Sequence, residues 1–407
     1  MLSTVTPDEA LKILTSAFGE LRTPAENCPL SAALGRVLAE DVESPEYIPG
    51  FDRSSVDGYA VAAADTFGCG ETSPALLKLR GRVEMGRAPD FSLAPGECAA
   101  IPTGGQLPEG ADAAVMLEYA EDYGGGLIGL IRSAAPGQNV VFRGDDAAPG
   151  RVILPAGRRL GAADIGALAA MGITEPLVRR RPIVGILSTG DELVPPDLVP
   201  GPSEVRDVNA PLLSALVRSC GGEPKELGIV RDEVSELDSA LSNATHGCEL
   251  VIVTGGSSAG AHDAVSRVIE ARGRLLFHGI AMRPGKPAML GDIGGTPVFG
   301  LPGHPGAAYF TARLLVAAHI RSLLGLEAQP RTVRARLTEN LPANDGRELF
   351  CGVRLRMENG ELWAEPIRTK SGLISALAAS DGTLRVARDC EGVHRGTPVT
   401  IELEDID

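Results

Sequence analysis

The residues best suited to chemistry lie in a glycine-rich turn, TGGSSAGAHD, which follows the apolar run LVIV that begins at Leu250. Glycines let backbone N–H groups approach an anion closely, and the N-terminus of a following helix adds positive potential. The turn carries Asp263 where a phosphate-binding loop would carry a lysine, and its glycine spacing is not that of a dinucleotide fingerprint. We predict half of a phosphate and metal site, with Asp263 holding Mg²⁺. The simpler alternative is a strand-to-helix turn in which Asp263 caps the helix.

Two further polar loops follow apolar runs in the same part of the chain. STGDEL, after IVGIL, offers Asp191 and Glu192, and LPGHPGAAY, after VFG, leads directly into a helix. The segment MRPGKP adds Arg283 and Lys286, which suit a tetrahedral oxyanion or, alternatively, belong to a solvated surface turn. Ligands of open α/β sheets bind beyond the carboxyl ends of the strands, so we expect these loops to share one site.

The elements that must position these loops change character along the chain. From residue 179 strands and helices alternate, which predicts a mainly parallel sheet with helices on both faces. Short runs broken by glycine and proline predict β structure elsewhere. The predicted units are a helical linker formed by 1–44 with 139–178, a β-rich lobe at 45–138, an α/β domain at 179–328 and a small β domain at 329–407. The run Thr6-Pro7-Asp8-Glu9 predicts a helix start with a capping box between Thr6 and Glu9.

Composition excludes several function classes. The 407 residues carry a formal net charge of −15, which argues against nucleic acid or an anionic membrane surface as the main partner. The seven cysteines are odd in number and form no CxxC pair, which is typical of reduced cytosolic thiols. No apolar run is long enough to span a bilayer, and we expect a cytoplasmic protein.

Taken together, the motifs resemble one family, the molybdopterin molybdenumtransferases (MoeA), whose relatives include the E domain of gephyrin. The resemblance covers nearly the whole chain and rests on eight motifs in family order: RSSVDGYAV, IPTGGQLPEGADAAV, NVVFRGDDAAPG, STGDELV, TGGSSAGAHD, MRPGKP, LPGHPGAA and SGLISALAASDG. It implies an α/β plus β fold: an elongated homodimer with a doubly wound molybdopterin-binding α/β domain, an inserted β-rich lobe and a C-terminal small β domain. The helical linker would be the dimerisation domain.

The resemblance also implies a reaction. Adenylylated molybdopterin and molybdate would be the substrates, molybdenum would be placed on the dithiolene sulfurs, and AMP would be released with the help of Mg²⁺. The active site would combine the α/β domain of one subunit with the lobe of the other. The adenylyltransferase of the same pathway and molybdoenzyme acceptors would be protein partners.

The resemblance also implies roles for individual residues, wherever a motif of this chain matches the family's motif. The implied catalytic residues are Asp57, Thr103, Asp146, Glu192, Asp232 and Asp263, of which Glu192, Asp232 and Asp263 would also hold the metal. The implied cofactor-binding residues are Gly255, Gly256, Ser257, Ser258, Gly260, Arg283, Lys286, Pro302, Gly303, Pro305, Arg347 and Ser371. Of these, Lys286, Arg347 and Ser371 would lie near the oxyanion.

The chain departs from the family pattern at several of these loops. Ser257 and Ala259 stand where the family usually has valines, and Arg283 stands for a usual lysine. The segment LPGHPGA differs from the usual LPGNPVS at His304, Gly306 and Ala307, and Ser380 takes the place of an asparagine. These departures leave open a variant dedicated to a different oxyanion or target enzyme.

Other functions remain compatible with the same residues. A non-catalytic scaffold could hold molybdopterin without turnover, although the three acids argue for catalysis. A hydrolase that splits a nucleotide pyrophosphate would also bind phosphate with the help of a metal ion, but it would need neither molybdate nor a dithiolene substrate. His262, His304 and Asp263 could also form a zinc site, although no third histidine or cysteine has ligand spacing.

Overall fold

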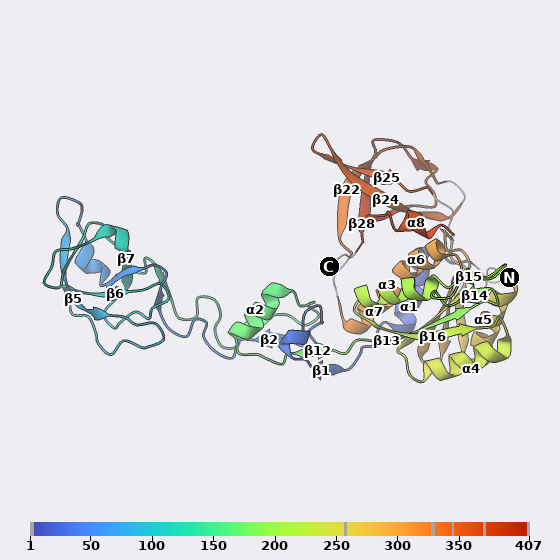
Figure 1. The fold of residues 1–407 in the computed structure, drawn as a ribbon, viewed down its shortest axis with the longest axis horizontal. Coiled ribbons are helices and arrows are strands. Elements are labelled where there is room, and N and C mark those ends of the chain that lie inside the picture. The colour runs from blue at the N-terminus through green and yellow to red at the C-terminus, as the bar shows by residue number, and fades with distance from the viewer. Residues whose placement is uncertain (1–3, 256–258, 327–329, 344–345, 369–371, 405–407) are drawn as a thin grey trace.

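The chain forms an elongated molecule with a β-rich lobe at one end, a slender linker unit in the middle, and two packed units at the other end (Figure 1). The structure is a computed structural model. It describes residues 4–255, 259–326, 330–343, 346–368 and 372–404, and for 259–263 it describes the backbone only. None of the described helices is long and apolar enough to cross a membrane.

A six-stranded sheet organises the unit that carries the polar loops. Its order is β16 (Glu223–Val230), β13 (Ile183–Thr189), β17 (Leu250–Gly255), β21 (Thr296–Leu301), β20 (Met289–Ile293) and β18 (Arg274–His278). The first four strands run parallel, β20 pairs antiparallel with β21, and the edge strand β18 pairs antiparallel with β20, so β20 alone runs in the opposite direction. The prediction of a mainly parallel sheet is therefore confirmed.

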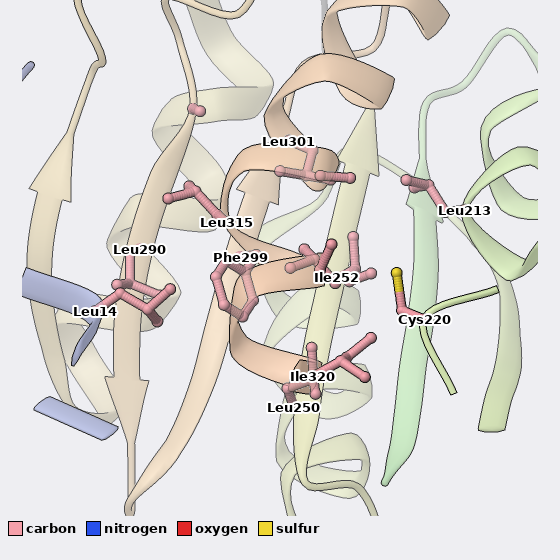
Figure 2. Packing of buried hydrophobic residues seen from close by; sticks show 14 of the residues in the cluster. Leu14, Leu213, Cys220, Leu250, Ile252, Leu290, Phe299, Leu301, Leu315 and Ile320 are labelled. Atoms are coloured by element: carbon pink, nitrogen blue, oxygen red, sulfur yellow. The ribbon is translucent and has the colours of Figure 1, made fainter. Parts of the chain in front are cut away.

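Helices cover both faces of this sheet. The helices of one face are α1 (Pro7–Phe18), α3 (Asn209–Ser219), α6 (Pro305–Leu314) and α7 (Val316–Leu324); those of the other are α4 (Val234–Thr245) and α5 (Ala259–Arg272). Alternate residues of β17 enter the two cores, because neighbouring strand side chains point to opposite faces. Leu250 and Ile252 join the first core (Figure 2), whereas Val251 and Val253 join the second. The doubly wound arrangement follows from this two-sided burial.

Helix α1 belongs physically to the α/β core, although it begins the chain. Thr6 and Glu9 form the predicted capping box, with the Thr6 Oγ1 accepting from the Glu9 N–H at 3.2 Å. The buried side chains Ala10, Leu14 and Phe18 follow at helical spacing and pack into the core shared with α7. The sequence predicted the start of this helix, but not the surface that its apolar face covers.

The linker unit and the lobe are built from short elements. The linker contains α2 (Ala162–Ala170) and the strand pairs β1 (Ala25–Asn27) with β12 (Leu177–Arg179), and β2 (Val42–Glu43) with β11 (Val152–Leu154). The lobe sheet has the order β7 (Ala113–Met116), β4 (Gly58–Val61), β6 (Glu97–Ile101), β5 (Ala75–Arg82), β9 (Leu127–Leu130) and β8 (Ala120–Asp122). The pair β3 (Arg53–Ser54) and β10 (Val140–Val141) lies where the chain enters and leaves the lobe.

The C-terminal unit is a small β barrel that docks on the α/β unit. Its strands are β22 (Thr332–Leu337), β24 (Glu348–Glu358), β25 (Glu361–Pro366), β26 (Gly382–Val386) and β28 (Pro398–Leu403). Pairing of β24 with both β25 and β26 closes the ring. The strand β19 (Met282–Arg283), which comes from the α/β unit, pairs with β24 in parallel. Arg313 on α6 also forms ion pairs with Glu402 at 2.8 Å and Glu404 at 2.7 Å. Strand pairing and ion pairs therefore both join the barrel to the α/β unit.

Candidate functional site

The three polar loops meet at one edge of the α/β sheet. β13, β17 and β21 are parallel neighbours, with Thr189 beside Gly255 and Thr254 beside Leu301. The three strand ends Thr189, Gly255 and Leu301, which the loops follow in the sequence, therefore lie side by side. This confirms the expected position of the loops at the carboxyl ends of parallel strands.

Gly255 is required by the closeness of the two strand ends. Its φ is +139°, and a Cβ added there would lie 1.8 Å from the carbonyl oxygen of Thr189. Gly303 lies against the same backbone, with its Cβ position 3.5 Å from the Gly255 carbonyl carbon. The absence of side chains leaves backbone groups of two loops at the surface, where an anionic ligand could approach them.

A cavity of about 700 Å³ opens above these strand ends. Four candidate residues line it: Glu192, Gly255, Gly303 and Pro305. Pro302, a fifth candidate, is buried beside them. The remaining candidates from TGGSSAGAHD are not tested, because Gly256, Ser257 and Ser258 lie outside the described residues and Gly260 and Asp263 are described only as backbone of α5.

The acids of the site come from two loops. Asp232 follows β16, and its carboxylate accepts a hydrogen bond from the hydroxyl of Thr189 at the end of β13. Glu192 is exposed, and its Oε2 lies 2.8 Å from the position of a Cβ added to Gly190, so it folds back over its own loop. Within the described side chains no group of three or more His, Cys, Asp or Glu converges on one point. The predicted metal set cannot be judged from this, since it includes Asp263.

Two residues that line this cavity were not singled out from the sequence. Asp207 accepts hydrogen bonds from the N–H groups of Asn209 at 3.0 Å and Ala210 at 3.1 Å, which anchors the start of α3. The Asn209 amide donates to Thr254 Oγ1 at 2.7 Å and to the Gly303 carbonyl at 2.8 Å. Asn209 thus ties α3 to two of the strand-end loops. The pattern Asp-Val-Asn before an apolar run is a recognisable helix start, but nothing in it indicates the contacts across the sheet.

A second cavity, of about 430 Å³, lies between α6 and the C-terminal barrel. It is mostly apolar and is lined by Arg283, Phe310, Cys351, Arg368 and Leu373, among others. Burial raises the pKa of the Cys351 thiol to about 11, so this cysteine is a neutral lining group at physiological pH. Arg283 reaches this cavity because β19 joins the barrel sheet.

The structure describes two of the other predicted oxyanion residues. Lys286 is exposed, and Arg347 is half-buried immediately before β24. Ser371 lies outside the described residues. The neighbouring Gly372 and His304 both line the larger cavity, with the His304 ring 3.5 Å from the Gly372 Cβ position. The segment that leads to α8 (Ile374–Leu377) therefore borders both cavities.

The candidate residues of the lobe form a separate group. The Asp57 carboxylate accepts a hydrogen bond from the Thr103 N–H at 2.8 Å, which holds the turn before β4 against the loop after β6. Asp146 is exposed in the loop between β10 and β11. Figure 1 shows this lobe at the opposite end of the molecule from the α/β unit, whose residues line the strand-end cavity. One chain therefore brings Asp57 and Thr103 together but does not bring them to Glu192 or Asp232.

Three family models match consecutive parts of the chain. "MoeA N-terminal region (domain I and II)" matches residues 5–172, "Probable molybdopterin binding domain" matches 185–322, and "MoeA C-terminal region (domain IV)" matches 334–403.

Curated relatives and solved structures match over nearly the full length. The molybdopterin molybdenumtransferase of Bacillus subtilis (strain 168) is 32% identical over 381 residues, which cover 92% of this chain and 88% of that protein. A protein of the same name from Nostoc sp. is 35% identical over 337 residues, covering 81% and 77%. The crystal structure of the molybdopterin biosynthesis moeA protein from Pyrococcus horikoshii OT3 superposes with a TM-score of 0.87 at 33% identity, covering 99% of this chain and 100% of that one.

Proposed function

This chain belongs to the molybdopterin molybdenumtransferase family, and from that premise we propose that it transfers molybdenum from molybdate to adenylylated molybdopterin with release of AMP. It is a transferase of molybdenum cofactor biosynthesis. The observation that carries the finer proposal is the edge of the sheet, where two glycine-lined loops and the Glu192 carboxylate line a cavity of about 700 Å³. The Asp232 carboxylate binds Thr189 at the end of a strand of the same edge. We assign the reaction to the cytoplasm, in keeping with its seven described cysteines, which form no disulfide.

In this proposal the cavity holds the nucleotide part of the substrate. Backbone groups around Gly255 and Gly303 can approach phosphate oxygens without a side chain in the way. Asn209 is a positioning residue that keeps Thr254 and Gly303 in register. The helix α6 begins at Pro305, so its N-terminal dipole also faces this edge.

The acids would hold the metal. Carboxylate and hydroxyl oxygens are the ligands that Mg²⁺ prefers, and the pair of Asp232 and Thr189 together with Glu192 supplies that donor chemistry. Asp263 is proposed as the third acid. When bound, Mg²⁺ would act as a Lewis acid on the phosphate oxygens. Arg283, Lys286, Arg347 and Ser371 are proposed to attract molybdate at the interface with the barrel.

A second copy of the chain would complete the site. Asp57 and Thr103 adjoin β4 and β6 of the lobe, which lies at the opposite end of the molecule from the α/β unit, so they could act at the strand-end cavity only on a neighbouring subunit. We propose the same for Asp146, in the loop between β10 and β11. We therefore propose a homodimer in which the lobe of each subunit covers the cavity of the other. The adenylyltransferase that supplies the substrate and the acceptor molybdoenzymes are its proposed protein partners.

The reaction is tested by following AMP and assembled cofactor in the presence of adenylylated molybdopterin, Mg²⁺ and molybdate. Asp232→Asn should lower AMP release by at least a hundredfold, since loss of metal stabilisation is worth several kcal/mol. The matched control is Glu233→Gln, an exposed acid at the next position. AMP release without molybdate from a substrate that lacks the dithiolene would identify a hydrolase instead. Tight substrate binding with no turnover would identify a scaffold.

The shared site is tested by mixing two inactive variants. Asp57→Ala and Asp232→Asn are each expected to be inactive alone. Mixed under conditions that exchange subunits, they should recover up to about a quarter of wild-type activity, because half the dimers are mixed and each holds one intact site. No recovery despite demonstrated subunit exchange would mean that each chain works alone.

A further inference from the structure

A third cavity, of about 540 Å³, lies where the linker unit meets the α/β unit. We call it the junction cavity. The chain crosses between the two units twice, through the segments 19–24 and 179–182, and both crossings border this space. Its charged lining residues are Arg22 from the first crossing, Arg179 from the second and Arg321 from α7.

Hydrogen bonds to backbone carbonyls hold the two chain crossings against α7 at the wall of the junction cavity. The Thr23 N–H donates to the Leu323 carbonyl at 3.0 Å, and the Arg179 guanidinium donates to the Thr23 carbonyl at 3.1 Å. A Cβ on Gly157 would lie 2.6 Å from the carbonyl oxygen of Gly325, so the linker passes directly over the end of α7. The segments that carry the arginines are therefore held in place by hydrogen bonds and close backbone packing.

The described lining of this cavity carries positive charge only. Of the described residues that line it, none is an aspartate or a glutamate. Arg22 donates to the carbonyls of Gly19 at 2.6 Å and Leu21 at 2.7 Å, and carbonyls carry no full charge. The Arg321 carbonyl accepts a hydrogen bond from the Leu326 N–H at 2.9 Å, but its guanidinium has no hydrogen bond or ion pair with another described residue. It also borders a smaller cavity with Glu402 and Glu404, but those carboxylates are bonded to Arg313.

A structural explanation accounts for only part of this cluster. Arg321 lies in the last turn of α7, where a cation is favoured by the helix dipole. The dipole of one helix does not account for the two further arginines that come from other segments. Three guanidinium groups around one concave surface repel each other unless an anion lies between them. The chain as a whole carries −15, so the cluster also runs against the average charge of the protein.

We propose that the junction cavity binds a phosphate-type tetrahedral oxyanion through Arg22, Arg179 and Arg321. Guanidinium groups match such an anion because they donate paired N–H groups in a planar fork. Since the arginines come from both chain crossings and from α7, the bound anion joins the linker to the α/β unit. It thereby fixes the angle at which the linker carries the lobe. This site is separate from the strand-end cavity and does not depend on the reaction proposed above.

Hydrogen exchange of the full-length protein tests and locates this site. Inorganic phosphate should slow exchange in peptides that span 19–24 and 177–182, relative to chloride at the same ionic strength. AMP and adenosine are the further arms: slowing by AMP as well as phosphate would show that a nucleotide can supply the phosphate group, and adenosine alone should do nothing. No slowing at these peptides by either phosphate or AMP would refute the proposal.

Variants separate this site from the oxyanion site proposed at the barrel interface. Arg321→Gln should weaken phosphate binding at the junction peptides by roughly tenfold or more, because one charge-assisted contact is lost. Arg181→Gln, in the same run of arginines but outside the lining, removes the same charge and should leave the response unchanged. An equal response in wild type and Arg321→Gln, or an equal loss in both variants, would show that the effect is not binding by these arginines.

Discussion

The buried histidine of the α/β core makes the stability of that unit depend on pH in a calculable way. His319 on α7 is 2% exposed and lies between the rings of Phe18 and Phe299, at centroid distances of 5.9 and 6.1 Å. Its Nε2 is buried without a hydrogen-bond partner. Burial lowers the pKa of His319 from 6.5 to about 4, because the apolar surroundings disfavour the imidazolium form.

The sign and size of the change in stability with pH follow from proton linkage. Above pH 6.5 the histidine is neutral in both the folded and the unfolded chain, so burial costs nothing through protonation. Between pH 6.5 and 4 only the unfolded chain binds the proton, and stability falls as the pH falls. At pH 5.5, one unit below the unfolded pKa, the loss is about 1.4 kcal/mol, or a factor of about ten in the unfolding equilibrium. This pH stays above the sequence pI of about 5.0, where aggregation would interfere.

Native-state hydrogen exchange of β17 and β21 is the suitable assay, since a chain of several units need not unfold in one step. The perturbation is His319→Leu, which keeps the volume similar and removes the titrating group. Wild type should lose about tenfold more protection than the variant between pH 7.5 and 5.5, after correction for intrinsic exchange rates. Carboxylates that titrate in the same range contribute equally to both proteins and cancel.

The exposed histidine at the end of α4 provides the control. His246→Gln removes an imidazole at the surface and should keep the full wild-type pH dependence. Equal losses of protection in wild type and His319→Leu would refute the reasoning, because the core would then tolerate the charged ring or open to water around it.

Further predictions concern the strand-end loops and the oxyanion pocket. Gly255→Ala should abolish AMP release, because its Cβ would overlap the Thr189 carbonyl, whereas Gly70→Ala, with nothing within 4 Å, should be silent; normal activity of the first variant would mean that the two strand ends are not closely packed in solution. Ala307→Ser, at a buried position in the first turn of α6, adds a hydroxyl donor and should lower the molybdate concentration that gives half-maximal AMP release by roughly tenfold. Arg283→Lys should have a smaller effect on that concentration. If neither change nor Lys286→Ala alters that concentration, molybdate binds elsewhere.

Local patterns in the sequence were sufficient to predict several helices and strands and the position of the polar loops at strand ends. The capping box of Thr6 and Glu9 is a contact between residues three apart, so the segment itself encodes it. The apolar run from Leu250 followed by glycines predicted a buried strand and a strand-end loop, because strand periodicity and glycine usage are local properties. The boundaries predicted for the four units and the roles of most site residues remain predictions.

Contacts between distant segments were decided only by the tertiary structure. Nothing in Asp-Val-Asn indicates that Asn209 bonds to Thr254 and Gly303, which are 45 and 94 positions away. The same holds for α1, whose apolar face could have covered the linker but packs on the sheet with α7. It holds also for Arg22, Arg179 and Arg321, which are far apart in the sequence and line one cavity in the fold. Periodicity tells which face of an element is buried, but the partner of that face depends on how all the units pack, and that information is not local.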